Sequence, residues 1–305
     1  MSSLVAVVLL AAGVGLVVGG AELFFDGLMA SAHRLRTSPF VLAALVSGLE
    51  LENLAAGIAA NAKDLPGAAA GTFLGGTTFL ALAVSGLAAV IAPIRAQLPG
   101  RVIVWTLAAP LPLVALSLDG ELSRLDGGVL VAWFCVAMIG IVRSGRSIAG
   151  EAPSARRRGA LVRLVAGLGV LTAGGELLGE GIRRTVSSFD VSQTLLGNTV
   201  VAASVEGEEV ARSVVPSRRG RGDIAIANVA GTIVHFVALN AGVIALVRPL
   251  SLDHDTLRLH TPVAAVSTAI LCALLWSRQG ISRRAGAALL AAYVVYVAAA
   301  VAVGV

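Results

Sequence analysis

About ten apolar segments, each long enough to cross a lipid bilayer as a helix, follow one another along the 305 residues of the chain. A hydrocarbon core about 30 Å thick needs roughly 20 apolar residues in helical form. Only 13% of the residues are charged, against roughly 25% in a soluble domain. We therefore predict an all-α integral membrane protein that crosses the bilayer many times. The predicted spans are residues 4–31, 39–61, 66–93, 102–118, 127–142, 160–182, 192–212, 223–247, 261–276 and 285–304.

The basic residues lie almost entirely between these spans, and mostly on one side of the membrane. With ten spans, one side holds the loops at 32–38, 94–101, 143–159, 213–222 and 277–284. Six of the 23 Lys and Arg residues fall on the other side: Lys63, Arg124, Arg183, Arg184, Arg248 and Arg258. The positive-inside rule then predicts a plasma membrane or cell inner membrane protein with both termini outside the cytoplasm. It also explains the net charge of +5 without a nucleic-acid partner.

An internal repeat divides the chain into two halves. Residues 20–27 (GAELFFDG) are similar to residues 174–181 (GGELLGEG), and residues 47–53 (SGLELEN) are similar to residues 203–209 (ASVEGEE). Because each half holds five spans, the second half must enter the membrane in the opposite sense. Inverted repeats are typical of secondary transporters, whose substrate sites lie near the midplane between the repeats. We predict a first five-helix repeat at 1–142, a basic cytoplasmic linker at 143–159 and a second, inverted repeat at 160–305.

Five glutamates lie inside apolar spans, where a charge is costly. They are Glu50 and Glu52 in the second span and Glu206, Glu208 and Glu209 in the seventh. Each charge costs roughly 2.5–3.5 kcal/mol on membrane-insertion scales, which favours a functional role. In a regular helix, residues three apart share a face, so Asn53 would accompany Glu50, and Glu209 would accompany Glu206. Two such faces meeting between the halves would form a cage of oxygen ligands for a divalent cation.

Some residues near these glutamates have two interpretations. Arg212 lies one turn after Glu208, and a salt bridge near a helix end would account for that glutamate without an ion. His235 is either a cation ligand or a hydrogen-bonded core residue. Cys135 and Cys272 lie in apolar runs away from any carboxylate cluster, and we expect buried, inert thiols. The pattern therefore favours a hard cation over a soft metal.

At these residues the chain resembles the calcium/cation antiporter superfamily, which includes sodium/calcium exchangers and cation/proton exchangers. In that family a segment similar to GTSLPE on the second helix of each half is followed by a segment similar to GNxxGS on the third. Residues 48–53 (GLELEN) and 204–209 (SVEGEE) resemble the first segment, and residues 71–76 (GTFLGG) and 227–232 (ANVAGT) resemble the second. The resemblance implies ten helices, external termini and a cation site, and it adds Thr72, Asn228 and Thr232 to the candidate ligands.

The chain departs from the family pattern at several of these positions. Asn53 and Glu209 fall where the family has its ion-binding glutamates. Leu49 and Val205 stand where the family has threonines. Glu50 and Glu206 stand at its serine positions, and Glu52 and Glu208 stand at its proline positions. Leu80 and Phe236 fall where sodium/calcium exchangers have polar ion-binding residues on the third helix of each half. Compared with the family, this chain has more carboxylates and fewer hydroxyls.

Together these patterns favour a secondary active antiporter that exports Ca²⁺ or another divalent cation in exchange for protons or Na⁺, without a cofactor. Protons are the favoured coupling ion for two reasons. Three carboxylates within four residues, 206–209, cannot all stay ionised in a low-dielectric setting without a bound cation. The missing hydroxyls, in turn, are oxygens that Na⁺ would be expected to use.

The sequence also bears on three other classes of function. An intramembrane metalloenzyme is not expected, because the chain lacks a motif such as HExxH. A ten-helix carrier of small organic solutes would need an aromatic-lined pocket, which an aromatic content of 4% disfavours. A transport-inactive exchanger homologue that serves as a scaffold or sensor is the remaining alternative. The sequence makes no prediction of oligomeric state.

Overall fold

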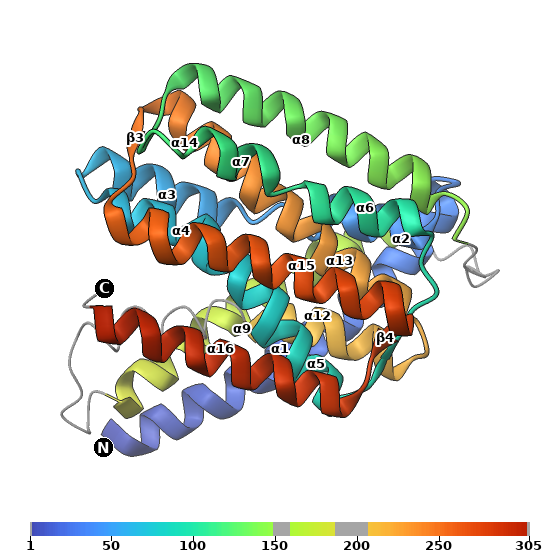
Figure 1. Cartoon of the computed structure of the whole chain (residues 1–305). Coiled ribbons are helices and arrows are strands. Elements are labelled where there is room, and N and C mark those ends of the chain that lie inside the picture. Colours follow the sequence, from blue (N-terminus) through green and yellow to red (C-terminus); the bar gives the residue numbers. More distant parts are fainter. Residues whose placement is uncertain (1, 149–158, 187–206, 304–305) are drawn as a thin grey trace.

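The computed structural model describes residues 2–148, 159–186 and 207–303 (Figure 1). Most of the predicted linker and seventh span, and with them Glu206, therefore lie outside the described residues. The elements of the first half are α1 (Ser2–Arg34), α2 (Pro39–Val46), α3 (Leu51–Ala62), α4 (Pro66–Thr78), the π-helix η1 (Phe79–Val84), α5 (Ser85–Ile91), β1 (Ile94–Arg95), α6 (Gly100–Ala108), α7 (Leu111–Leu116), β2 (Glu121–Leu122) and α8 (Arg124–Gly145). Those of the second half are α9 (Ala160–Val186), α12 (Gly207–Arg218), α13 (Gly222–Val234), the π-helix η4 (His235–Asn240), α14 (Ala241–Val247), β3 (Leu250–Ser251), the π-helix η5 (Thr256–His260), α15 (Thr261–Arg278), β4 (Gly280–Ile281) and α16 (Arg283–Val303).

Eight of the described helical segments are long and apolar enough to cross a membrane. Their bounds agree to within about five residues with every predicted span except the fourth and the seventh. The prediction of an all-α membrane protein is therefore confirmed.

The fourth predicted span is a shorter apolar helix that is broken near its middle. α6 ends at Ala108 and α7 begins at Leu111. Pro110 lies between them. A proline kinks or breaks a helix, because it lacks an N–H group and its ring clashes with the carbonyl four residues earlier. The N–H of Ala109 instead donates to the carbonyl of Thr106 at 3.3 Å, which tightens the turn before the break.

The predicted repeat is visible as the same series of elements in both halves. α4, η1 and α5 cover residues 66–91, and α13, η4 and α14 cover residues 222–247. Each boundary in the second series lies at the offset that separates residues 47–53 from 203–209 in the sequence. Because π-helices are rare and short, their occurrence at equivalent positions is strong evidence that one backbone plan is built twice.

Each half packs its last helix on the other half. α8 contacts α14, where a Cβ on Gly127 would lie 2.6 Å from the carbonyl oxygen of Gly242. In the same way α16 contacts α5, where a Cβ on Gly286 would lie 2.6 Å from the carbonyl oxygen of Gly86. Figure 1 shows α8 and α16 on opposite sides of the bundle. The two halves are therefore interlocked rather than joined only by a linker.

The loops group at two ends of the bundle as the span count predicted. At one end, β1 pairs antiparallel with β4, and Ser38 donates a hydrogen bond to the carbonyl of Gly145 at 3.2 Å. At the other end, β2 pairs antiparallel with β3, and Arg248 forms an ion pair with Asp64. Each two-stranded ladder takes one strand from each half.

α1 and α9 run antiparallel and meet at glycines spaced seven residues apart. Gly13, Gly20 and Gly27 of α1 face α9, and Gly167, Gly174 and Gly181 of α9 face α1. A Cβ on Gly20 would lie 2.7 Å from the backbone nitrogen of Leu171, and a Cβ on Gly174 would lie 2.7 Å from that of Val17. Since lipid gives membrane helices little hydrophobic reason to associate, close backbone packing of this kind is a main source of attraction.

We expect Gly20→Val to force α1 and α9 apart, because the added side chain has no room beside Leu171. Overpacking of this kind costs about 1–3 kcal/mol, so the unfolding temperature of the purified protein in detergent should fall by roughly 2–5 °C. Gly19→Val is the matched control, since no described atom lies within 4 Å of where its Cβ would be. Equal unfolding temperatures for the two variants would contradict this helix contact.

Candidate functional site

The second predicted span is interrupted at residues 47–50. α2 ends at Val46, α3 begins at Leu51, and Glu50 is the N-cap residue of α3. The chain passes close to η4 here, and a Cβ on Gly48 would overlap the imidazole ring of His235. The expectation of one regular helix through Glu50 is therefore wrong. At the interruption the chain lies against the other half, with no room for a side chain at Gly48.

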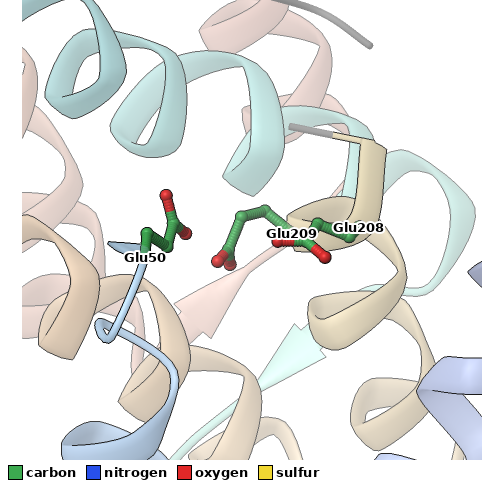
Figure 2. Close-up of side chains that lie close together, drawn as sticks. All are labelled: Glu50, Glu208 and Glu209. Atoms are coloured by element: carbon green, nitrogen blue, oxygen red, sulfur yellow. The ribbon is translucent and has the colours of Figure 1, made fainter. Parts of the chain in front are cut away.

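The interruption brings Glu50 to the start of α12 in the other half. Glu208 and Glu209 lie in the first turn of α12, and one oxygen from each of the three carboxylates lies within 4.8 Å of the others. Their side chains are 8%, 11% and 1% exposed for Glu50, Glu208 and Glu209. Figure 2 shows Glu50 on one side of the cluster and the two α12 residues on the other. Three of the five predicted glutamates thus meet between the halves.

The guanidinium of Arg212 lies between these carboxylates. Its Nη2 atom is 2.6 Å from Oε1 of Glu208, 2.7 Å from Oε1 of Glu209 and 3.6 Å from Oε1 of Glu50. Its Nη1 atom donates to the carbonyl of Ser47 at 3.0 Å. The predicted pair of Glu208 and Arg212 is confirmed, but it does not lie at a solvated helix end, because only 2% of Arg212 is exposed.

Each carboxylate turns one oxygen toward Arg212 and has the other held by a neutral side chain. Asn53 donates to Oε2 of Glu50 at 2.6 Å, and Asn228 donates to Oε2 of Glu209. Thr172 donates to Oε2 of Glu208 at 3.4 Å. These neutral partners come from α3, α13 and α9, so three further helices orient the inner oxygens.

Four of the predicted ligands lie outside this arrangement. Glu52 is exposed. The hydroxyls of Thr72 and Thr232 donate to carbonyls of their own helices, those of Ala69 at 2.8 Å and Asn228 at 3.0 Å.

His235 is the fourth of these residues. Its Nδ1 lies 2.8 Å from the carbonyl of Gly231, and its ring meets Phe134 edge-on at 4.8 Å. This is the hydrogen-bonded core position that the sequence offered as the alternative to a ligand.

Sequence reasoning missed two features of the site. It did not predict that Arg212 is central, although arginine three and four residues after two glutamates was a signal that it could reach both. It also did not single out Thr172. That residue gave no signal, since its contact with Glu208 depends on how α9 and α12 pack.

The electrostatics of the cluster leave an excess of negative charge. If all three carboxylates are ionised, Arg212 leaves a net charge of −2 in a setting where uncompensated charge is expensive. One divalent cation or two protons would balance it. Convergent carboxylate and amide oxygens are the ligands that hard divalent cations prefer.

Comparison with known proteins gives a consistent picture. The family described as sodium/calcium exchanger protein matches residues 5–143 and 159–302. The chain is 25% identical over 317 residues to the putative antiporter CaxA of Alkalimonas amylolytica, covering 96% of this chain and 98% of the relative. It is 24% identical over 298 residues to the inner membrane protein YrbG of Escherichia coli, covering 90% of each. The solved structure of the sodium-calcium exchanger NCX_Mj soaked with Na⁺ and Sr²⁺ is similar with a TM-score of 0.82 and 25% identity, over 97% of this chain and 99% of that chain.

We expect Gly48→Ala to disturb the site through His235. The new methyl group would overlap the imidazole, and accommodating it should cost about 1–3 kcal/mol, measured as a lower unfolding temperature in detergent. In a His235→Ala background the same change should cost much less, so a double-mutant cycle should show coupling of the two positions. Gly75→Ala serves as control, since its Cβ would have no described neighbour within 4 Å. Additive effects at 48 and 235 would refute the contact.

Proposed function

The chain belongs to the sodium/calcium exchanger protein family, and on that premise we propose that it exchanges a divalent cation for protons across a membrane. The relatives named above include an exchanger and a putative antiporter. One observation carries the proposal: Glu50 from one half meets Glu208 and Glu209 from the other, with one oxygen of each within 4.8 Å of the other two. A site shared between inverted repeats is suited to alternating access, because movement of one half against the other exposes it to each side in turn.

Ca²⁺ is the proposed cargo among divalent cations. Its flexible coordination by six to eight oxygens tolerates a mixture of carboxylate, amide and carbonyl ligands. Glu50, Glu208 and Glu209 would provide the carboxylates. Asn53 and Asn228, whose side-chain amides donate to Glu50 and Glu209, would provide amide oxygens once those amides turn. Glu206, which the repeat pairs with Glu50, is proposed as a further ligand.

Protons are the proposed coupling ion. Two protons balance the net charge of −2 on the ionised cluster, as one divalent cation does. Loading one divalent cation and releasing two protons therefore keeps the charge of the site constant. Carboxylates in contact titrate together, which suits a carrier that must take up and release protons as a set. Leu80 and Phe236 are fully buried and apolar at the family's polar positions, which supports protons over Na⁺.

A transport-inactive homologue, acting as a scaffold or sensor, is the second candidate function. It is favoured by one observation, the position of the Arg212 guanidinium between the three carboxylates. The flux experiment below separates the two candidates.

In proteoliposomes loaded with Ca²⁺, with the membrane potential clamped, we expect an inward proton gradient to drive more Ca²⁺ efflux than an inward Na⁺ gradient. Glu50→Gln should abolish efflux, because it removes one of the converging charges, while Glu121→Gln in the exposed β2 loop should not. Efflux that follows Na⁺ and ignores pH would overturn proton coupling but leave antiport standing. Absence of Ca²⁺, Mn²⁺ and Mg²⁺ flux under both gradients would favour the inactive homologue.

The orientation in the membrane is a separate proposal, supported by the charge asymmetry of the loops. The end of the bundle with the β1–β4 ladder would face the cytoplasm, and the end with the β2–β3 ladder would face outward, together with both termini. The membrane would be the plasma membrane or cell inner membrane.

Impermeant thiol labelling of intact cells tests this orientation. Cys135 is exposed on α8, contrary to the expectation that both thiols are buried, whereas Cys272 is buried as expected. The assay therefore needs a Cys135→Ser background. In it, Leu118→Cys should be labelled from outside, and Ser147→Cys should be labelled only after the membrane is permeabilised. The reverse pattern would invert the topology without affecting the site.

A further inference from the structure

Arg212 holds the position that a bound cation would need. A Ca²⁺ ion lies 2.3–2.6 Å from its ligand oxygens, and the Oε1 atoms of Glu208 and Glu209 are already within 2.6 and 2.7 Å of Nη2. An ion that contacts these two oxygens and Oε1 of Glu50, which is 3.6 Å from Nη2, would lie too close to Nη2 for both to be present. The guanidinium and a shared cation therefore exclude each other.

We propose that Arg212 is a tethered cation that alternates with the transported divalent cation at the carboxylate cluster, and so determines the affinity of the site. This inference rests on the proposed function. When cargo leaves, the guanidinium returns to the carboxylates, and when cargo binds, it displaces Nη2 from between them.

The chemistry of the guanidinium suits this role. It cannot be deprotonated in proteins, so its charge is present at every working pH, whereas a lysine at this depth would readily lose its proton. Arg212 is nearly fully buried, and its contacts extend to Glu50 and the Ser47 carbonyl in the first half. A residue whose role was only to pair with carboxylates of its own helix would need neither of these contacts with the first half.

The physical consequence is a weaker and more releasable site. With three ionised carboxylates and no arginine, an empty site would carry a charge of −3, which would bind cations tightly and would be costly to expose to a low-dielectric pathway. Arg212 reduces that negative charge from −3 to −2 in the empty state. A cation that binds must then break the ion pairs between Arg212 and the carboxylates. This cost keeps the affinity of the site for the cation low enough for release.

Ca²⁺ binding to the purified protein in detergent, measured by isothermal titration, tests the proposal directly. Arg212→Gln removes the charge and keeps a polar side chain with an N–H donor. Coupling within close buried charge pairs is worth about 1.5 kcal/mol or more. We therefore expect Ca²⁺ to bind to Arg212→Gln at least about tenfold more tightly than to the natural chain. Arg219→Gln is the matched control, since it removes the same charge from an exposed arginine paired with Glu22 and Asp26. Its affinity should equal that of the natural chain.

Thermal unfolding provides a second readout. Without Ca²⁺, Arg212→Gln should unfold at a lower temperature than the natural chain, because the carboxylates lose their positive partner. Added Ca²⁺ should raise its unfolding temperature by more than that of the natural chain, because a tighter ligand stabilises more at a given concentration. Equal or weaker Ca²⁺ binding by Arg212→Gln would overturn the proposal and leave Arg212 as a structural clamp.

If Arg212→Gln fails to fold, Arg212→Lys replaces it. A lysine at this depth holds its proton less firmly than an arginine, and it cannot bridge the Ser47 carbonyl and the carboxylates with a planar fork. It therefore competes with Ca²⁺ less well than Arg212 but better than a glutamine, so Ca²⁺ affinity should rise by a smaller factor; an unchanged or reduced affinity would overturn the proposal. Failure of the inference is distinguishable from failure of the proposed function. Flux by the natural chain without a gain in affinity refutes only the role of Arg212. A gain in affinity in a chain without flux refutes only antiport.

Discussion

The buried ion pairs of Arg212 with Glu50, Glu208 and Glu209 are the interaction on which the geometry of the site depends. Carboxylates withdrawn from water need a positive partner, and here the helix that carries two of them also supplies it. The same guanidinium donates to the carbonyl of Ser47, at the interruption between α2 and α3. One side chain thus balances the carboxylate charge in the second half and donates a hydrogen bond to a backbone carbonyl in the first half.

The carboxylate oxygens that face away from Arg212 extend this dependence to the rest of the bundle. Asn53, Thr172 and Asn228 each hold one of them, from α3, α9 and α13. Partners beyond the primary ligands orient those ligands and tune their affinity. Any movement of α9 or α13 against α12 therefore changes the direction of a carboxylate, which links the geometry of the site to the packing of helices that contribute no charge to it.

Patterns within the sequence predicted the spans and the repeat, because both follow from the length of apolar runs and from similarity at a fixed offset. The interruption at residues 47–50 could not be predicted in that way, since it lies at a contact of Gly48 with His235, a residue of the other half that is distant in the sequence. The glutamates were recognised individually because their burial is costly. The central place of Arg212 required knowing that α3 and α12 meet, and Pro110 marked a break that hydropathy alone read as a continuous span.

The glycine spacing on α1 and α9 has a mechanical consequence. Each glycine lies against the backbone of the partner helix, so turning either helix about its own axis would drive the Cβ of a neighbouring residue into that backbone. Steric exclusion at six positions on the two helices opposes such a turn. A torque applied to α1 is therefore transmitted to α9, and the rotations of these two helices, one from each half, are coupled as in a rigid body.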